Sequence, residues 1–182
     1  MKMDAPLTAL GPLPVDDLLA ALPGADDDLW ERFTLRRHML GHAATRTIAI
    51  VWGDTIEGFD EPVIFEPDYA PEPLRSAAKA CADRLVERLG GGKVTRLMLV
   101  DLPAGAEVVP HRDTKPIITD PRRCHVPVVT NAAVSFVIDG IDHHLAVGQA
   151  YEVDNTREHS VANRGSTRRV HLICDVMPQR AA

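Results

Sequence analysis

Residues 102–113 read L-P-A-G-A-E-V-V-P-H-R-D, and they lie in a region where short β-rich runs alternate with turn residues. The turn Asp139-Gly140, between two alternating runs, is a strong hairpin signal. The expected strands are residues 94–102, 108–113, 124–130, 132–138, 142–147, 150–153, 159–162 and 169–177. About eight short strands at this spacing predict a mostly β fold, a double-stranded β-helix of the jelly-roll or cupin-like type. Such a fold has a mouth between its sheets that suits a small-molecule site.

The first half of the chain has a different sequence pattern, and we expect it to add flanking N-terminal helices to this barrel. Residues 1–15 are rich in proline and predict a loosely held arm. Residues 15–22 predict a short helix that ends at a Pro-Gly pair. After a proline-rich loop at 62–73, apolar residues recur with helical spacing over 74–89, and the triple glycine at 90–92 ends this second helix.

The pattern also predicts how the chain is divided. Residues 45–52 are rich in β-formers and predict a further strand, whereas residues 26–30 fit a helical turn and a loop equally well. The length is that of one domain, so we expect a single domain over 1–182. Within it, residues 1–92 flank a jelly-roll core formed by residues 93–177.

The bulk composition excludes some classes of partner. The formal net charge is −6 and the pI is about 5.7, so we expect no nucleic-acid partner, because phosphate binding needs a basic face. The N-terminus has no long apolar run, which predicts neither a secretory signal nor a membrane span. Cys81, Cys124 and Cys174 are widely spaced, so we expect buried thiols in a reducing cytoplasm rather than disulfides or a zinc knuckle. The oligomeric state stays open.

Two histidines and an aspartate have the spacing of a metal site. His111 and Asp113 are two residues apart on an expected strand, and alternate side chains of a strand point to the same face. These two side chains can hold one ion while His159 reaches it from another strand. Two imidazoles and a carboxylate on one side of a metal form the ligand set of non-haem Fe(II) oxygenases. Four other histidines lack such spacing and are expected to be ordinary packed or surface residues: His38, His42, His143 and His144.

Basic residues accompany this predicted metal site. Arg123 and His125 share one face of an expected strand, and Arg169 begins a run that is too apolar for an exposed strand. We therefore expect Arg169 to face the cavity, although a shift of one residue would exchange it with Arg168. A guanidinium is a planar fork that matches a carboxylate, so the cavity suits a dicarboxylate that chelates the metal at its other end. The arginines expected in ordinary surface ion pairs are Arg122, Arg164 and Arg168.

Four segments carry a resemblance to a known family. They are P-A-G-A-E-V-V-P-H-R-D at 103–113, R-C-H-V-P at 123–127, D-N-T-R-E-H-S-V-A-N at 154–163 and R-V-H-L-I-C-D-V at 169–176. In this order they resemble the aspartyl/asparaginyl β-hydroxylase family of Fe(II)/2-oxoglutarate oxygenases, and similar segments occur in bacterial free-proline hydroxylases. The resemblance covers roughly residues 95–176.

The resemblance implies a cofactor set of Fe(II), 2-oxoglutarate and O2. It implies metal binding by His111, Asp113 and His159. It also implies that Arg169 pairs with the distal carboxylate of 2-oxoglutarate, and that Arg123 and His125 lie near its metal-chelating end.

The chain departs from the family pattern at some points. Animal members have glycine in place of the acidic ligand, so Asp113 makes the chain similar to the bacterial branch. The family's serine that helps to hold 2-oxoglutarate falls at Val100, which leaves part of that contact unassigned. The proline hydroxylases have an additional C-terminal region, whereas this chain stops soon after Met177, which disfavours free proline as the substrate.

The function that these features predict is hydroxylation of a C–H bond in an amino acid, or in an aspartyl or asparaginyl residue of a peptide, with succinate and CO2 as coproducts. The expected partner is thus a small-molecule or peptide substrate. One alternative is a non-catalytic cupin-type module that binds a ligand or metal. Another is a zinc hydrolase, which needs a positioned base near the metal. Glu158 neighbours His159 but is expected to point to the opposite face.

Overall fold

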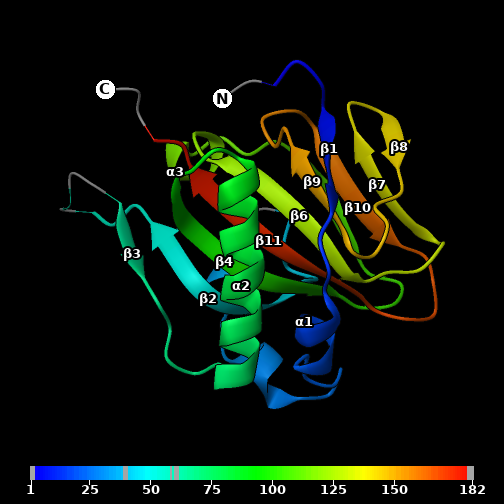
Figure 1. The fold of residues 1–182 in the computed structure, drawn as a ribbon. Helices are drawn as coiled ribbons and strands as arrows, with labels where there is room; N and C mark the ends of the chain where they lie inside the picture. The colour runs from blue at the N-terminus through cyan, green and yellow to red at the C-terminus, as the bar shows by residue number, and fades with distance from the viewer. Residues whose placement is uncertain (1–2, 39–40, 58, 60–61, 180–182) are drawn as a thin grey trace.

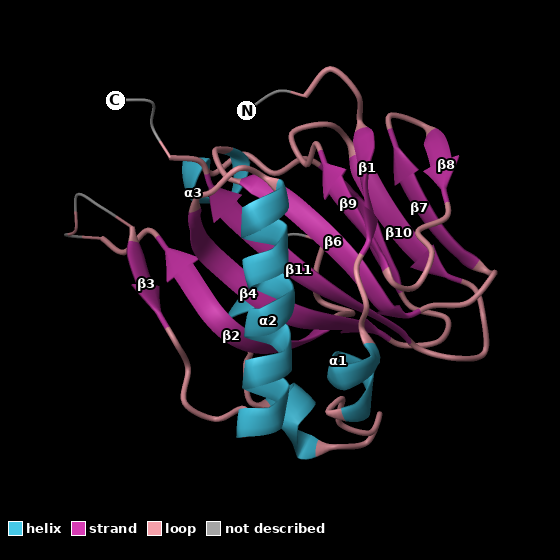
Figure 2. Cartoon of the chain, in the orientation of Figure 1, coloured by secondary structure: helices cyan, strands magenta, loops and turns pink. Residues whose placement is uncertain are grey.

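The computed structural model describes residues 3–38, 41–57, 59 and 62–179, and these residues form two antiparallel sheets that face each other (Figures 1 and 2). The larger sheet has the order β1-β9-β6-β11-β4-β2-β3, and the smaller one has the order β5-β10-β7-β8. This confirms the predicted mostly β, cupin-like fold.

The strands are β1 (Leu7–Pro12), β2 (Arg46–Asp54), β3 (Val63–Phe65), β4 (Lys93–Leu102), β5 (Glu107–His111), β6 (Arg122–Val129), β7 (Val134–Ile138), β8 (Ile141–His143), β9 (Gln149–Val153), β10 (His159–Asn163) and β11 (Arg169–Met177). The helices are α1 (Asp16–Ala20), α2 (Glu72–Arg88) and α3 (Pro116–Thr119), with 3-10 turns η1 (Asp28–Glu31) and η2 (Leu35–His38).

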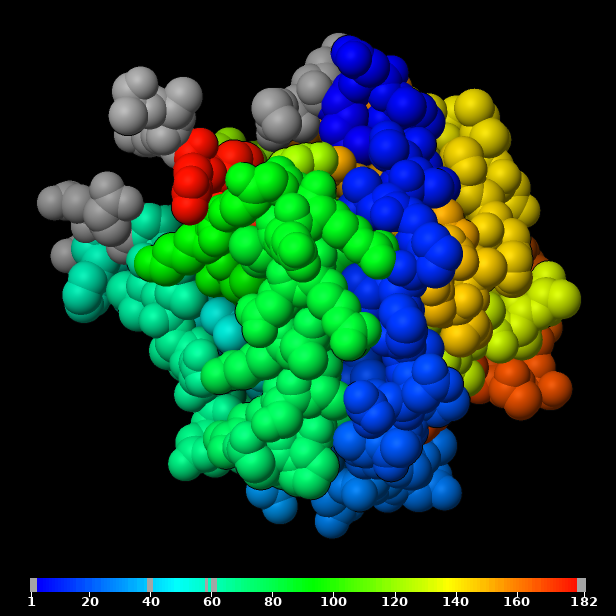
Figure 3. All heavy atoms as spheres, in the orientation of Figure 1, coloured from blue at the N-terminus to red at the C-terminus, as the bar shows by residue number. Residues whose placement is uncertain are grey.

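Helix α2 covers the outer face of the larger sheet, with the N-terminal segment beside it (Figures 1 and 3). Its buried stripe, which includes Leu74 and Leu85, packs against Leu99 of β4 and Leu172 of β11 in one apolar cluster. The helix and its apolar face thus agree with the predicted periodicity. Among the residues that the structure describes, no helix has the length and apolar content needed to cross a membrane.

A glycine after α2 lets the chain turn closely onto the last strand. Gly92 has a φ of +142°, and a Cβ atom there would lie 2.6 Å from Cγ1 of Val176 and 2.7 Å from the carbonyl oxygen of Met177. Only glycine fits this approach, because any side chain would collide with β11. The glycine run therefore positions β4 beside β11, at the centre of the larger sheet.

The inner face of the larger sheet carries the polar residues of the predicted site. Strands β6 and β11 are paired so that His125 lies opposite Ile173 and Arg123 opposite Asp175. Side chains opposite one another on paired strands point to the same face, so these residues line one surface. The side chains of β11 that point to the opposite face of the sheet, such as Leu172, pack under α2. This explains why β11 is buried on both faces and yet begins with an arginine.

Four sequence predictions need correction. Residues 7–12 are not a loose arm but form β1, which pairs with β9 at the edge of the larger sheet. The proline-rich loop contains the short strand β3, which pairs with β2. Strand β8 ends at His143 rather than at residue 147. Strand β5 ends at His111, so Asp113 lies in the following loop and not on the strand.

The open question at residues 26–30 is settled in favour of a helical turn. Residues 28–31 form η1, and the side chain of Asp27 accepts a hydrogen bond of 2.8 Å from the backbone N–H of Leu29. Such a cap satisfies a donor that the first turn leaves free. Trp30 is thereby held in the core, with its indole N–H donating to the carbonyl oxygen of Gly24.

The three cysteines should be unreactive until the protein unfolds. All are free and buried, and burial raises the pKa of Cys81, raises that of Cys124 to about 12, and raises that of Cys174 well above its usual value. Since the thiolate is the reactive form, we expect slow reaction of the native protein with 5,5′-dithiobis(2-nitrobenzoic acid) at pH 8 and reaction of all three thiols in guanidinium chloride. Rapid modification of any cysteine in the native protein would contradict this packing.

Candidate metal and cosubstrate site

Two histidines of the smaller sheet face each other across neighbouring strands. His111 of β5 pairs with His159 of β10, and their ring centroids are 4.3 Å apart. The Nδ1 atom of His111 lies 2.8 Å from the carbonyl oxygen of Val109, and that of His159 lies 2.9 Å from the carbonyl oxygen of Arg157. These bonds favour the tautomers that carry the proton on Nδ1 and leave each Nε2 with a lone pair. The Nε2 atom of His111 is buried and has no hydrogen-bond partner among the described residues.

The carboxylate of Asp113 is held near these rings by the loop that follows β5. Its backbone N–H donates to the carbonyl oxygen of Asn155, and its Oδ2 atom accepts from the Asn155 side chain at 2.8 Å and from Arg123 at 2.5 Å. Burial raises the pKa of Asp113, but Arg123 and Asn155 lower it by more, to about 2. Asp113 is therefore ionised at neutral pH. Its place is fixed by these contacts rather than by the strand alternation that we expected.

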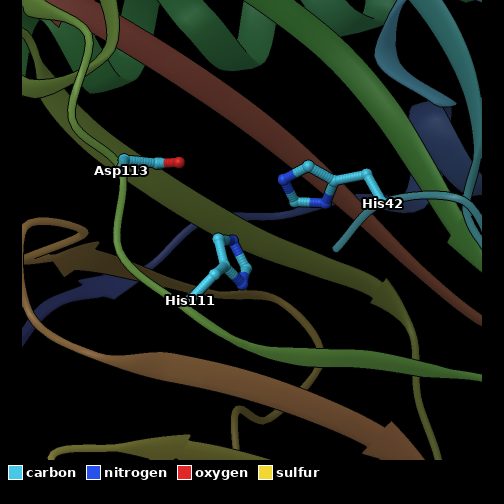
Figure 4. Close-up of side chains that lie close together, drawn as sticks. All are labelled: His42, His111 and Asp113. Atoms are coloured by element: carbon cyan, nitrogen blue, oxygen red, sulfur yellow. The ribbon is translucent and has the colours of Figure 1, made fainter. Parts of the chain in front are cut away.

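His42 joins His111 and Asp113 in a compact group of potential ligands that does not include His159, and the sequence analysis missed it. Potential ligand atoms of His42, His111 and Asp113 all lie within 4.8 Å of one another, and Figure 4 shows the three side chains around a common space. His42 is buried in the segment between η2 and β2, and its ring lies edge-on to His111 at 4.9 Å. Burial, followed by the charge of Arg36, lowers its pKa to about 2 and keeps the ring neutral.

Only the glycine before His42 hinted at this approach. Gly41 has a φ of +82°, and a Cβ atom there would lie 3.3 Å from Nδ1 of His111. A glycine is favoured because it tolerates this φ and lets the backbone approach the ring. The sequence places Gly41 and His42 far from His111, so no local spacing could have revealed the contact.

Arg169 lies inside the barrel, beside the histidines. It is buried and lines an inner cavity together with His111, His125 and His159. Its Nη2 atom lies 2.6 Å from Nδ1 of His171, while its buried Nε–H has no partner among the described residues. Arg168 points outward instead, with its Nη2 donating to the carbonyl oxygen of Pro23.

Arg123 and His125 lie at the other end of this face. Arg123 is buried and paired with Asp113 and with Asp175 at 2.7 Å. Burial lowers its pKa, but the two carboxylates raise it by more, so it stays charged. The ring of His125 packs against Phe136 at 5.5 Å, and burial and then Arg169 lower its pKa well below its usual value. The charged guanidinium of Arg123 and the neutral imidazole of His125 thus lie side by side on β6.

The other basic residues near the site lie at or close to the protein surface. Arg122 forms an ion pair with Glu152, and Arg164 is exposed. An open pocket of about 340 Å³ leads to the site and is lined in part by His38, Arg112 and Lys115. His38 therefore lies at the entrance, although the sequence analysis gave it no role.

Comparison with known proteins identifies the family. The sequence profile described as aspartyl/asparaginyl β-hydroxylase matches residues 21–178. The chain belongs to this family. Members of the aspartyl/asparaginyl β-hydroxylase family are oxygenases, so membership supports an oxygenase-type function.

Solved structures agree with the fold. A protein from Burkholderia pseudomallei, described as an oxidoreductase of the 2OG-Fe(II) oxygenase family, is similar with a TM-score of 0.61 and 13% identity, over 98% of this chain and 88% of that one. AviO1 from Streptomyces viridochromogenes Tue57 is similar with a TM-score of 0.55 and 18% identity, over 97% and 91% of the two chains. At these identities the likeness shows the fold alone. No curated protein matches the sequence.

Replacement of Arg123 by glutamine should destabilise the protein strongly. The change leaves two buried carboxylates, those of Asp113 and Asp175, without their charged partner. Breaking a buried ion pair in this way costs about 3–5 kcal/mol. We expect a loss of this size in the free energy of unfolding of the metal-free protein, measured by urea denaturation. Arg84→Gln on the exposed face of α2 is the matched control and should be neutral; equal stability of both variants would show that the network contributes nothing.

Proposed function

We propose that this protein is an Fe(II)/2-oxoglutarate-dependent oxygenase that hydroxylates a C–H bond of an amino acid, or of an aspartyl or asparaginyl residue in a peptide. One observation carries the proposal. Two imidazoles, those of His111 and His159, line one inner cavity with the buried Arg169, which has no acidic partner among the described residues, and the ionised Asp113 lines the adjoining open pocket with His111. That combination suits a divalent metal and a dicarboxylate together.

The residues present fit such a metal. Under this proposal His111, Asp113 and His159 hold the iron, and the orphaned Nε2 of His111 is the atom that most needs a partner. Family membership supports the same assignment of cofactor. When bound, Fe(II) with 2-oxoglutarate would supply the oxidation of a C–H bond by O2, with succinate and CO2 as coproducts.

The protein itself supplies orientation and charge. The carbonyl oxygens of Val109 and Arg157 fix the imidazole rings, and Arg123 keeps Asp113 ionised and in place. Such outer contacts orient metal ligands and tune their basicity. Arg169 would offer its unpaired Nε–H to the distal carboxylate of the cosubstrate. Apolar residues along the cavity keep water away from the reacting carbon; they include Val100, Val108, Phe136 and Val161.

A zinc hydrolase is disfavoured by the bases available. Glu158 is exposed and precedes β10, whereas His159 is buried, so Glu158 is poorly placed to act as a base at the metal. His42 is close enough, but its pKa of about 2 makes it a weak acceptor of protons from water. A non-catalytic module remains the alternative, and turnover distinguishes it from an oxygenase.

Anaerobic addition of Fe(II) and 2-oxoglutarate tests the metal assignment. The wild-type protein should develop the visible charge-transfer band of the chelate, and in air it should form succinate. Asp113→Ala should lose most of the band because a ligand and its charge are gone. Asp120→Ala, at an exposed position nearby, is the control and should keep it. No band in the wild type, or full retention of the band by Asp113→Ala, would refute the assignment.

Arg169→Ala tests the cosubstrate site. Hydrogen bonds to charged groups are worth about 1.5–3 kcal/mol, so the Kd for 2-oxoglutarate should rise roughly 10- to 150-fold. Titration of the chelate band measures this Kd. Arg168→Ala, whose side chain points outward, should leave the Kd unchanged. The opposite pattern would mean that the roles of the two arginines have been exchanged.

A further inference from the structure

Arg36 is a buried cation that has no role in the proposed mechanism. It lies on η2, is only 7% exposed and lines the inner cavity. Its Nη1 donates to Oγ1 of Thr45 at 2.8 Å, and no carboxylate of the described residues lies within ion-pair distance. A buried charge without a partner is costly, so natural proteins rarely retain one without a ligand.

The other buried arginines show that Arg36 and Arg169 are special. Arg123 is paired with two aspartates, and Arg96 lies 3.8 Å from Asp54 and stacks on Trp52. Of the buried arginines in the described part of the chain, Arg36 and Arg169 are the two without an acidic partner. Both line the same inner cavity. That cavity therefore has an excess of positive charge that an anion would neutralise.

The strand register places Arg36 at the Arg169 end of the cavity. Arg46 of β2 pairs with Asp101 of β4, so Thr45, one residue earlier, lies level with Leu102. Leu102 in turn pairs with Arg169 of β11. Thr45, which anchors Arg36, is thus in the same row of the sheet as Arg169. Burial is the largest cause that lowers the pKa of Arg169, to about 9, and the charge of Arg36 is the next; burial also lowers the pKa of Arg36 to about 9, and there the next cause is the charge of Arg123.

We propose that Arg36 is a second carboxylate-binding residue, and that it shares with Arg169 the distal carboxylate of 2-oxoglutarate. This inference rests on the proposed function. The cavity has an open volume of only about 30 Å³, so an incoming dicarboxylate displaces side chains. Arg36 lies on a short turn, whereas Arg169 is fixed on a central strand, so Arg36 is the group that turns to meet the ligand.

The test compares two ligands that differ only at the distal end. 2-Oxopentanoate has the chain length and the oxo acid of 2-oxoglutarate but lacks the distal carboxylate. Isothermal titration calorimetry of the full chain, loaded with Mn(II) under anaerobic conditions, gives the Kd of each ligand without turnover. Arg36→Gln should weaken 2-oxoglutarate binding by about 10-fold or more and leave 2-oxopentanoate binding unchanged. Arg37→Gln, on the same turn but paired with Glu31 at the surface, should alter neither Kd.

The possible outcomes distinguish between different roles for Arg36. Equal weakening of both ligands would overturn the inference, because the residue would then serve the oxo-acid end or the fold. Unchanged Kd values would also overturn it and would leave Arg36 for a carboxylate of the substrate. If Arg36→Gln does not fold, Arg36→Lys decides, since it keeps the charge but loses the fork; it should selectively weaken 2-oxoglutarate. Failure of the wild type to bind 2-oxoglutarate would instead refute the proposed function.

Discussion

The buried pairing of Arg123 with Asp113 and Asp175 is the constraint on which the site depends. Asp175 is on the last strand of the larger sheet, and Asp113 is in the loop that leaves the smaller sheet. One guanidinium on β6 therefore ties the two sheets together at the position where the candidate ligands meet. It also keeps Asp113 ionised in spite of burial. Without it, Asn155 alone would hold Asp113 near the paired histidines.

Much of the fold could be predicted because its signals are local. The stripe of α2 and the spacing of Arg123 and His125 on β6 appear within single segments, and each agrees with how those segments pack. The apolar run after Arg169 predicted a strand buried on both faces, and it is buried between α2 and the cavity. Periodicity thus indicated which side of a strand faces the interior, and with it which residues line the site.

The parts that escaped prediction depend on contacts between distant segments. His42 reaches the metal-binding group only because the turn at Gly41 packs on His111, and nothing near either residue reports this. Arg36 is on a short turn whose sequence fits an exposed surface as well as a cavity. Asp113 was placed on a strand because its spacing fits one, whereas Arg123 and Asn155 hold it in a loop. Propensity describes each segment alone, and the site is formed where segments meet.

The strand β1 has a practical consequence for anyone who shortens this chain. The family match begins at residue 21, so a version trimmed to that boundary would lack residues 7–12. β9 would then be exposed, with main-chain groups free to recruit another molecule into the sheet. β1 is itself short, is irregular between Ala9 and Gly11, and ends in a proline, all of which discourage further strand addition. Strand β1 thus covers the edge of β9 and protects the larger sheet from edge-to-edge aggregation.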